Sequence, residues 1–553
     1  MNSPLDSMIH QAIQAFQSGN LNSADIILNR VLAAHSKNLP ALHILGLVKA
    51  SQSKHKEAAE LLKRAIRLNP NEPSLHYNLA KALQESGADK ESLPHHKKAV
   101  ELNPTNPEAW LNYGKSLSSL GLNVDALDVY KNSLQINPNY TEAFLNIGAT
   151  LKDLERYDEA LNYADKALSI NPTLSEAWSN RGIALKELKR YDEALASYDK
   201  AISFKPEYHE AWYNKGVTLG ELKRYDEALA SYDKAISFKP DYSDAYWNQA
   251  LSHLVTGNFE SGWKNYEYRW KKTKAEPMRH QEFPLLTDLN EISGKSVLVW
   301  SEQGYGDTIQ FSRFIEKLIE LKADVIFEVQ EPLKELLQNS FLQPKVISQE
   351  ESTGVIDFQI PLVSLPFLFS TNFDNIPSTN SYIRADEENL IFWREKLNSK
   401  NKKMNIGVAC SGNKNHFNDK NRSMDLRFFE PIADNVNLFL IQKDLREKDQ
   451  DFLSQYPDIK FLGEEIKSFN DSASVIQAMD LVITVDTSLA HLSGALGKRT
   501  FILLPWNPEW RWLLDRQDSP WYPTAKLFRQ PNRDNWEEVI KEVILHLNLD
   551  YQV

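Results

Sequence analysis

The sequence predicts an α-helical repeat solenoid followed by an α/β region of two Rossmann-like lobes with a cleft between them. Two observations predict this architecture. Prolines recur every 34 residues through the first half, and the second half alternates strand-like and helix-like segments. These patterns predict a solenoid at residues 1–272, a linker at 273–293, and lobes at 294–400 and 401–553.

The composition limits the classes of function. The chain has 553 residues, of which 42% are apolar and 25% charged, as in ordinary globular proteins. Its formal net charge of −12 argues against nucleic acid as a partner, because binding phosphates requires clustered Lys and Arg. The single cysteine, Cys410, excludes an intramolecular disulfide. With no recognisable secretory signal or membrane-length apolar run, we expect a cytoplasmic protein without a membrane span.

Small residues accompany the repeating proline at fixed positions. The prolines are Pro70, Pro104, Pro138, Pro172, Pro206 and Pro240. Glycine recurs at Gly46, Gly114, Gly148, Gly182 and Gly216, where two helices must approach closely. The pattern indicates roughly eight helix pairs, and the recurring proline ends the second helix of a pair. It resembles the tetratricopeptide repeat (TPR), whose arrays form solenoids with an extended concave face.

A ladder of asparagines follows the same period on the first helix of successive pairs. Its members are Asn78, Asn112, Asn146, Asn180, Asn214 and Asn248. A carboxamide both donates and accepts hydrogen bonds, so we expect the ladder to bind the backbone of a polypeptide on the concave face. In the alternative interpretation, each asparagine only pairs with a neighbouring helix. The ladder is similar to one in the repeats attached to O-linked N-acetylglucosamine transferases.

Eight strands are predicted in the second half. They are Ser296–Trp300, Val325–Val329, Ile356–Ile360, Asn405–Ala409, Leu438–Gln442, Ile459–Leu462, Leu481–Val485 and Thr500–Leu504. Alternation of these strands with helices predicts parallel sheets. The charged segment Asn398–Lys403 predicts a hinge between the lobes. In such folds the chemistry lies in loops that follow strands and begin helices.

The loop after the first strand contains two glycines and an aspartate. Gly304 and Gly306 predict a tight backbone turn, after which Asp307 caps a helix. The segment is similar to a dinucleotide fingerprint, but Ile309 replaces the third glycine. In the alternative interpretation Asp307 is only a helix cap.

The loop after the predicted strand Asn405–Ala409 contains several cations. Lys414, Lys420 and Arg422 form a polar loop suited to a diphosphate, although solvated surface charge is the alternative.

A buried strand ends at Asp486. Thr487 and Ser488 then begin a helix whose free amides favour an anion, and His491 lies one turn further on.

Four tryptophans lie close together in the segment Pro505–Gln530, with Arg511 and Arg529 nearby. We expect one or two of them to be exposed in the cleft, where they could stack on a sugar or a base. The tryptophans are Trp506, Trp510, Trp512 and Trp521.

Together these segments resemble the heptosyltransferase-like (family 9) glycosyltransferases of bacteria, which have the two-lobed GT-B architecture. The resemblance rests on GYGDTIQFSR, GNKNHFNDKNRS, VDTSLAHLSGALGK and PEWRWLLDRQDSPWYPTAKLFRQ. The second half is also similar to the glycosyltransferase-type domain often fused to TPR repeats. In that family a Gly-Asp pair supplies the catalytic base, which implies Gly306 and Asp307. An Asp-Thr-x-x-x-His-Leu motif holds the donor diphosphate, which implies Asp486, Thr487 and His491.

The resemblance implies transfer of a sugar from a nucleotide-sugar donor to a polypeptide or glycan acceptor presented with help from the repeats. Asp307 would be the catalytic base. The donor and its diphosphate would be bound by Gly304, Gly306, Lys414, Arg422, Asp486, Thr487, Ser488 and His491. GT-B enzymes generally use protein cations and helix amides in place of a metal, so the resemblance implies no metal and no cofactor besides the co-substrate. The alternative is a non-catalytic TPR interaction scaffold with a degenerate GT-B domain, which the short first lobe favours.

Overall fold

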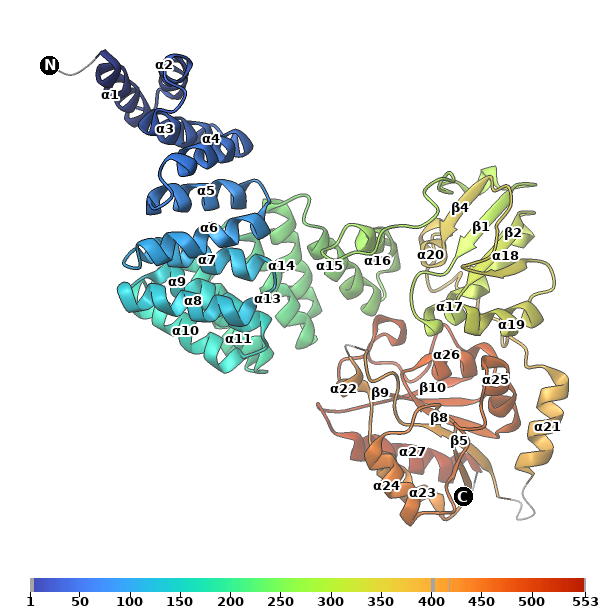
Figure 1. Cartoon of the computed structure of the whole chain (residues 1–553). Helices are drawn as coiled ribbons and strands as arrows, with labels where there is room; N and C mark the ends of the chain where they lie inside the picture. Colours follow the sequence, from blue (N-terminus) through green and yellow to red (C-terminus); the bar gives the residue numbers. More distant parts are fainter. Residues whose placement is uncertain (1–3, 399–402, 417, 552–553) are drawn as a thin grey trace. The chain divides into compact units, whose positions relative to one another are not determined.

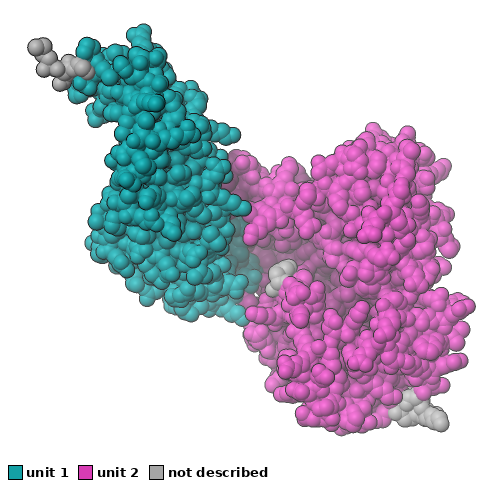
Figure 2. Space-filling view, viewed as in Figure 1, with its two compact units in different colours: residues 1–222 teal, residues 223–553 magenta. Residues whose placement is uncertain are grey.

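The computed structural model describes residues 4–398, 403–416 and 418–551. The chain divides into two compact units, residues 1–222 and 223–553 (Figure 2). Most of the predicted hinge at Asn398–Lys403 lies outside the described residues.

The first unit is a stack of helix pairs, as the repeat period predicts (Figure 1). The pattern continues into the second unit. The helices are α1 (Pro4–Gln17), α2 (Leu21–Ala34), α3 (Leu39–Ser51), α4 (His55–Leu68), α5 (Pro73–Glu85), α6 (Asp89–Leu102), α7 (Pro107–Ser119), α8 (Asn123–Ile136), α9 (Thr141–Asp153), α10 (Tyr157–Ile170), α11 (Ser175–Glu187), α12 (Tyr191–Phe204), α13 (His209–Glu221), α14 (Tyr225–Phe238), α15 (Ser243–Val255) and α16 (Phe259–Tyr266). The prediction of a helical repeat solenoid is confirmed.

The recurring proline also provides a hydrogen-bond acceptor for the next pair. An aromatic nitrogen early in the following helix bonds to its carbonyl oxygen. The pairs are Trp110–Pro104 at 2.9 Å, Trp178–Pro172 at 2.8 Å, Trp212–Pro206 at 2.9 Å and His76–Pro70 at 2.9 Å. Where the pattern places glycine, helices approach closely, since a methyl group at Gly182 would lie 2.5 Å from Tyr198 Cε1. The recurring proline therefore ends a helix and provides a hydrogen-bond acceptor, and the recurring glycine leaves space for a side chain of the neighbouring helix.

A second periodic contact joins three successive first helices, α11, α13 and α15, to the helix before each of them. The side chain at one position donates to an aspartate sixteen residues earlier. The pairs are Arg181–Asp165 at 2.8 Å, Lys215–Asp199 at 2.7 Å and Gln249–Asp233 at 2.7 Å. Because the donor changes while the aspartate stays, the contact depends on a hydrogen bond and not on charge alone.

Two parallel sheets form the α/β region, which confirms the prediction of parallel strands (Figure 1). The first has the order β3-β2-β1-β4, and the second β10-β9-β8-β5-β6-β7. The strands are β1 (Ser296–Trp300), β2 (Asp324–Val329), β3 (Lys345–Ser348), β4 (Phe358–Pro361), β5 (Asn405–Ala409), β6 (Asn437–Leu440), β7 (Lys460–Phe461), β8 (Leu481–Val485), β9 (Thr500–Leu504) and β10 (Ala525–Arg529). The edge strands β3 and β10 were not predicted; each carries Lys or Arg, as edge strands often do.

Helices connect these strands. They are α17 (Tyr305–Phe311), α18 (Ile315–Glu320), α19 (Glu331–Ser340), α20 (Leu365–Leu368), α21 (Glu387–Leu397), α22 (Asp419–Arg422), α23 (Glu430–Ala433), α24 (Glu447–Gln455), α25 (Phe469–Ala478), α26 (Ser488–Ala495) and α27 (Trp536–Tyr551). The direction of strand addition reverses between β1 and β4 in the first sheet, and between β5 and β8 in the second. Ligands of open α/β sheets bind at the carboxyl edge beside such a reversal.

The last helix pair shares a hydrophobic core with the α/β region. Trp263 of α16 is 1% exposed and packs edge-on against Trp510, Phe311 and Trp521, with ring centroids 5.2–6.3 Å apart. Its indole nitrogen donates to the Thr371 carbonyl at 3.1 Å. One core therefore extends across residue 272, where we predict the end of the solenoid.

This shared core predicts how fragments will behave. A fragment starting at Lys223 should unfold cooperatively, whereas one starting at Thr273 should aggregate or melt at much lower temperature. The shorter fragment lacks Phe259, Trp263 and Tyr266, each worth about 2–3 kcal/mol when buried. Thermal unfolding and size-exclusion chromatography of both fragments would test this. Equal melting temperatures would contradict it.

His96 of α6 predicts an acid sensitivity of the solenoid. It is fully buried beside Tyr113, and neither ring nitrogen has a hydrogen-bond partner among the described residues. Burial lowers the pKa of His96 to about 4, so the unfolded chain binds the proton first as the pH falls below 6.5. The first unit should therefore lose about 3 kcal/mol of stability between pH 7 and pH 4.

Urea unfolding of residues 1–222 at several pH values would measure this loss. The variant His96→Phe should reduce the slope between pH 6.5 and pH 4, and His35→Phe, at an exposed position, should not. An unchanged slope in His96→Phe would show that other groups cause the loss.

Candidate functional site

Side chains of the protein itself fill the carboxyl edge of the first sheet where its strand order reverses. Glu302 follows β1 and accepts two hydrogen bonds from Arg269, both at 3.0 Å, and one from the Val363 amide at 3.1 Å. Arg269 belongs to the 3-10 helix η1 (Glu267–Trp270) directly after α16, and both side chains are about 95% buried. An internal ion pair thus occupies the position that a ligand would take in this sheet.

A second ion pair lies at the carboxyl end of the neighbouring strand, β2. Glu328, at the carboxyl end of β2, is buried and pairs with Arg279, which also donates to the Ser301 carbonyl. Arg279 lies over the ring of Trp300, 4.8 Å from its centroid. Part of the segment 273–293, predicted as a linker, is therefore packed against the first sheet.

The reversal in the second sheet brings two predicted motifs together. Arg422 donates from Nη1 to the Asp486 carbonyl at 3.0 Å. A methyl group at Gly412 would lie 2.9 Å from Arg422 Nη2 and 3.1 Å from Thr487 Cγ2. The Nε of Arg422 is buried and has no partner among the described residues. The cationic loop and the start of α26 are therefore in contact at the carboxyl ends of β5 and β8.

The start of α17, which follows the first strand of the first sheet, packs closely against the start of α26. A methyl group at Gly306 would lie 2.7 Å from His491 Cδ2 and 3.5 Å from Ser488 Cα. The prediction of a tight turn at Gly304 and Gly306 was wrong, because Gly304 has a φ of −68° and Gly306 lies within α17. Glycine is needed at 306 because α26 approaches, and not because of backbone strain.

Asp307 does not begin its helix, contrary to prediction. Gly304 is the N-cap, and Asp307, three residues later, accepts from the Gly304 amide at 3.1 Å. Its other oxygen forms an ion pair with Arg511. Burial raises the pKa of Asp307, and the Arg511 guanidinium opposes the rise. The carboxylate predicted as a base is thus held in a charged pair.

Arg511 lies at the centre of this cluster, and the sequence analysis did not assign it to the candidate site. It is 8% exposed and contacts three side chains. Besides pairing with Asp307, it donates to Gln310 Oε1 at 2.8 Å and to Glu509 Oε2 at 2.5 Å. Asp307 lies 204 residues away in the chain, so no local motif could have revealed the pair.

His491 and Asp486 are both buried beside this cluster. His491 Nδ1 lies 2.9 Å from Tyr522 Oη, and its ring stacks on Trp512. Burial, with Arg511 and other arginines, lowers the pKa of His491 well below its usual value, so the ring is neutral at pH 7. Burial and the nearby Glu509 raise the pKa of Asp486 to about 7.

The other predicted residues lie differently. Ser488 is partly exposed as the first residue of α26. Lys414 is exposed on the loop after β5, and no contact with Arg422 or α26 is seen in the described part of the chain. Of the four tryptophans only Trp506 is partly exposed, with Lys223 Nζ 3.6 Å from its ring centroid. The other three pack in the core, as most tryptophans do.

The six asparagines of the ladder are all partly exposed on first helices. Asn78 contacts His43 Nε2 at 2.9 Å, and Asn112 donates to Tyr77 Oη at 3.1 Å, in each case in the preceding first helix. Asn146 and Asn248 donate to carbonyl groups of their own helices. Asn180 and Asn214 make no side-chain hydrogen bond within the described residues. Pairing with a neighbouring helix therefore applies to the first two asparagines.

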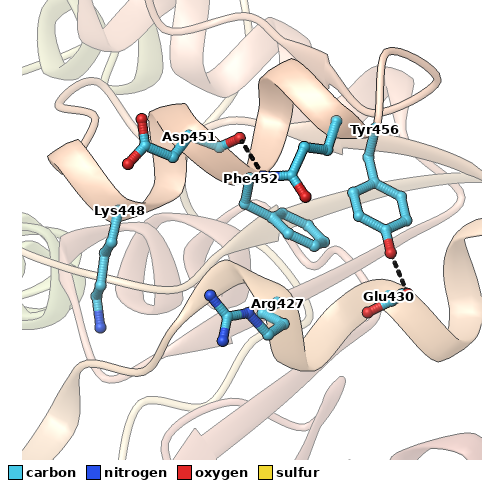
Figure 3. Close-up of a pocket in the computed structure, with 7 residues that line it drawn as sticks. Arg427, Glu430, Lys448, Asp451, Phe452 and Tyr456 are labelled. Atoms are coloured by element: carbon cyan, nitrogen blue, oxygen red, sulfur yellow. Dashed lines mark hydrogen bonds between the residues drawn. The ribbon is translucent and has the colours of Figure 1, made fainter.

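A separate cavity of about 200 Å³ lies between α24 and the segment 426–433 (Figure 3). Its lining is polar, and the Tyr456 hydroxyl donates to Glu430. The residues are Arg427, Glu430, Lys448, Asp451, Phe452, Gln455 and Tyr456. None of them belongs to the predicted site, and the two cations are balanced by two carboxylates.

Comparisons with known proteins identify the repeats. The tetratricopeptide repeat family matches residues 141–174, 175–208 and 209–242, and two related repeat families match residues 46–87 and 97–128. Tetratricopeptide repeats are thus confirmed over residues 46–242. Protein FlbA of Caulobacter vibrioides is 22% identical over 315 residues. That alignment covers 52% of this chain and 52% of FlbA, so the chain spans about half the length of this relative.

Solved structures similar to this chain cover the repeats. YrrB, described as a TPR protein with an unusual peptide-binding site, is 28% identical over 34% of this chain and 96% of its own, with a TM-score of 0.29. MamA of Desulfovibrio magneticus RS-1 is 21% identical over 30% and 95%, with a TM-score of 0.29. A tetratricopeptide repeat protein of Parabacteroides merdae is 18% identical over 45% and 99%, with a TM-score of 0.39.

No helix among the described residues is long and apolar enough to cross a membrane. Within residues 4–398, 403–416 and 418–551, no group of three or more His, Cys, Asp or Glu side chains could hold a metal ion.

The ion pair between Arg269 and Glu302 predicts a large effect of a single substitution. Arg269→Met leaves Glu302 buried and unpaired, which should cost about 3–5 kcal/mol of unfolding free energy. The double variant Arg269→Met with Glu302→Gln should recover part of this loss. Chemical denaturation of residues 223–553 would measure both effects. A loss below about 1 kcal/mol in the single variant would contradict burial of the pair.

Proposed function

We propose that the second half of the chain is a glycosyltransferase with a GT-B-like arrangement of two Rossmann-like lobes. A nucleotide-sugar donor binds at the carboxyl ends of β5 and β8, and the repeats help to present a polypeptide or glycan acceptor. The convergence of Arg422, the start of α26 and the loop carrying Asp307 is the observation that most supports this proposal. These three parts come from segments more than 60 residues apart in the chain.

The donor diphosphate needs positive charge and hydrogen-bond donors. Arg422 provides a guanidinium whose buried Nε has no partner among the described residues, and α26 provides the free amides of its first turn. Thr487 and Ser488 add hydroxyl groups at the same helix start. Neutral His491 packs behind them and positions the helix against Gly306. The proposal needs no metal, because the protein supplies the positive charge.

In the proposed reaction, an acceptor hydroxyl attacks the anomeric carbon of the donor sugar. A carbon–oxygen bond forms there while the bond to the diphosphate breaks. Asp307 accepts the hydroxyl proton, and Arg422 with the α26 amides stabilises the charge on the departing nucleoside diphosphate. The raised pKa of Asp307 suits a general base, whereas its pairing with Arg511 opposes this role.

The repeats support a protein-interaction role. Tetratricopeptide arrays present extended concave surfaces, and one similar protein, YrrB, is described by its peptide-binding site. We place a polypeptide on the asparagine ladder. Asn180 and Asn214 are the best candidates, because their amides make no hydrogen bonds within the described residues.

A second function, a non-catalytic TPR interaction scaffold, is favoured by one observation. The carboxylate of Asp307 is already bound by Arg511 and the Gly304 amide, so it is less available as a base. In a scaffold the same contacts would be purely structural.

Measurements of donor binding and of turnover should distinguish a glycosyltransferase from a non-catalytic scaffold. We expect the protein to bind one of the UDP-, GDP- or ADP-linked sugars, and Arg422→Met to weaken this binding about tenfold or more, the loss of one charge-assisted pair. Lys541→Met, on the exposed surface of α27, is the matched control for the loss of one positive charge and should bind normally. Isothermal titration calorimetry would measure the affinities.

Asp307→Asn should leave donor binding within about threefold but lower transfer or donor hydrolysis by roughly 10²–10⁴. Donor binding without turnover, unchanged by this substitution, would support the scaffold. No binding of any donor would overturn the proposed site.

A further inference from the structure

Several carboxyl groups lie close to the guanidinium groups of the proposed donor site. Arg422 and Arg511 face three acids, since Asp307 and Glu509 pair with Arg511 and Asp486 is the buried neighbour of both arginines. A nucleoside diphosphate would add further negative charge. Close like charges in a water-poor site oppose each other strongly. Binding of such a ligand is therefore favoured when a carboxylate is neutralised or moves away.

Glu509 is the acid that can move. Its carboxylate makes one hydrogen bond among the described residues, to Arg511 Nη1 at 2.5 Å, and its side chain is 28% exposed. It lies in the loop between β9 and the 3-10 helix η6 (Trp510–Trp512). Asp307 is held at both oxygens, by the Gly304 amide and by Arg511, and is 19% exposed.

Arg511 itself is fixed. Its Nε donates to Gln310, and its guanidinium lies 4.4 Å from the centroid of the Trp510 ring. If Glu509 turned toward solvent, the Nη1 edge would become free without any change at Asp307 or Gln310. A phosphate oxygen is the natural replacement, because guanidinium groups bind carboxylates and phosphates with the same geometry.

We propose that Glu509 is an internal competitor of the donor's diphosphate, which occupies Arg511 Nη1 in the empty site and yields it to a phosphate oxygen on binding. This inference rests on the donor site proposed above. The exchange favours ligands that carry an anionic diphosphate, since a neutral sugar cannot displace a carboxylate from an arginine. Movement of Glu509 would also remove one of the causes that raise the pKa of the neighbouring Asp486.

Calorimetric titration of inorganic pyrophosphate and UDP into the full chain would test the exchange. Glu509→Gln should bind both ligands about tenfold more tightly than the unaltered protein. Asp518→Asn is the matched control, because it changes the net charge equally and removes an exposed pairing with Arg516. It should bind within about twofold of the unaltered protein. Glu509→Ala should show the same gain as Glu509→Gln.

The outcomes distinguish this inference from the donor site. Binding by the unaltered protein, with no gain in either Glu509 variant, would overturn the competition but leave the site. Absence of binding to all four proteins would overturn the site and the competition with it. Arg511 keeps Asp307 and Gln310 as partners in both Glu509 variants, so their melting temperatures should stay close to that of the unaltered protein.

Discussion

The contact between the starts of α17 and α26 is the constraint on which the candidate site depends. Gly306 faces His491 and the backbone of Ser488 so closely that a side chain at 306 would collide with them. This contact places the loop after β1 beside the loop after β8, although the two belong to different sheets. Asp307 of α17 pairs with Arg511 of η6 beside this contact. The chemistry of the site is thus set by one glycine as much as by its charged residues.

Burial of these charges has a consequence for any reaction. Asp307, Asp486 and Arg511 are all removed from water to a large extent, so their interactions are stronger than on a surface, and so are the penalties for leaving any of them unpaired. Arg511 stabilises the ionised form of Asp307 while burial destabilises it. A ligand that changed the charge near Arg511 would shift this balance directly. The same arrangement could thus support a base or a permanent structural pair.

The sequence allowed the local features to be predicted and not the distant pairs. The 34-residue period, the central strands and the helix start at Ser488 follow from short-range patterns of proline, glycine and apolar residues. The pairs Arg511–Asp307 and Arg269–Glu302 join residues 204 and 33 positions apart, and nothing in their local sequence marks them. The burial of Trp510 and Trp521 could not be predicted for a related reason. Their burial depends on Trp263 and Phe311, which come from segments far from Pro505–Gln530.

The carboxyl edges of the two sheets differ in what occupies them. In the first sheet the occupant comes from the segment that ends the repeat array. In the first sheet Arg269 fills the reversal point through Glu302, while Tyr266 exchanges hydrogen bonds with Gln303 at 3.1–3.3 Å. Glu302 and Gln303 directly precede Gly304, the N-cap of the helix that carries Asp307. The segment that ends the repeat array therefore fixes the position of the candidate base. In the second sheet no such internal pair occupies the reversal among the described residues, and Arg422 keeps an unpartnered nitrogen there. One edge thus holds the segment that ends the repeat array, and the other leaves an arginine nitrogen without a partner among the described residues.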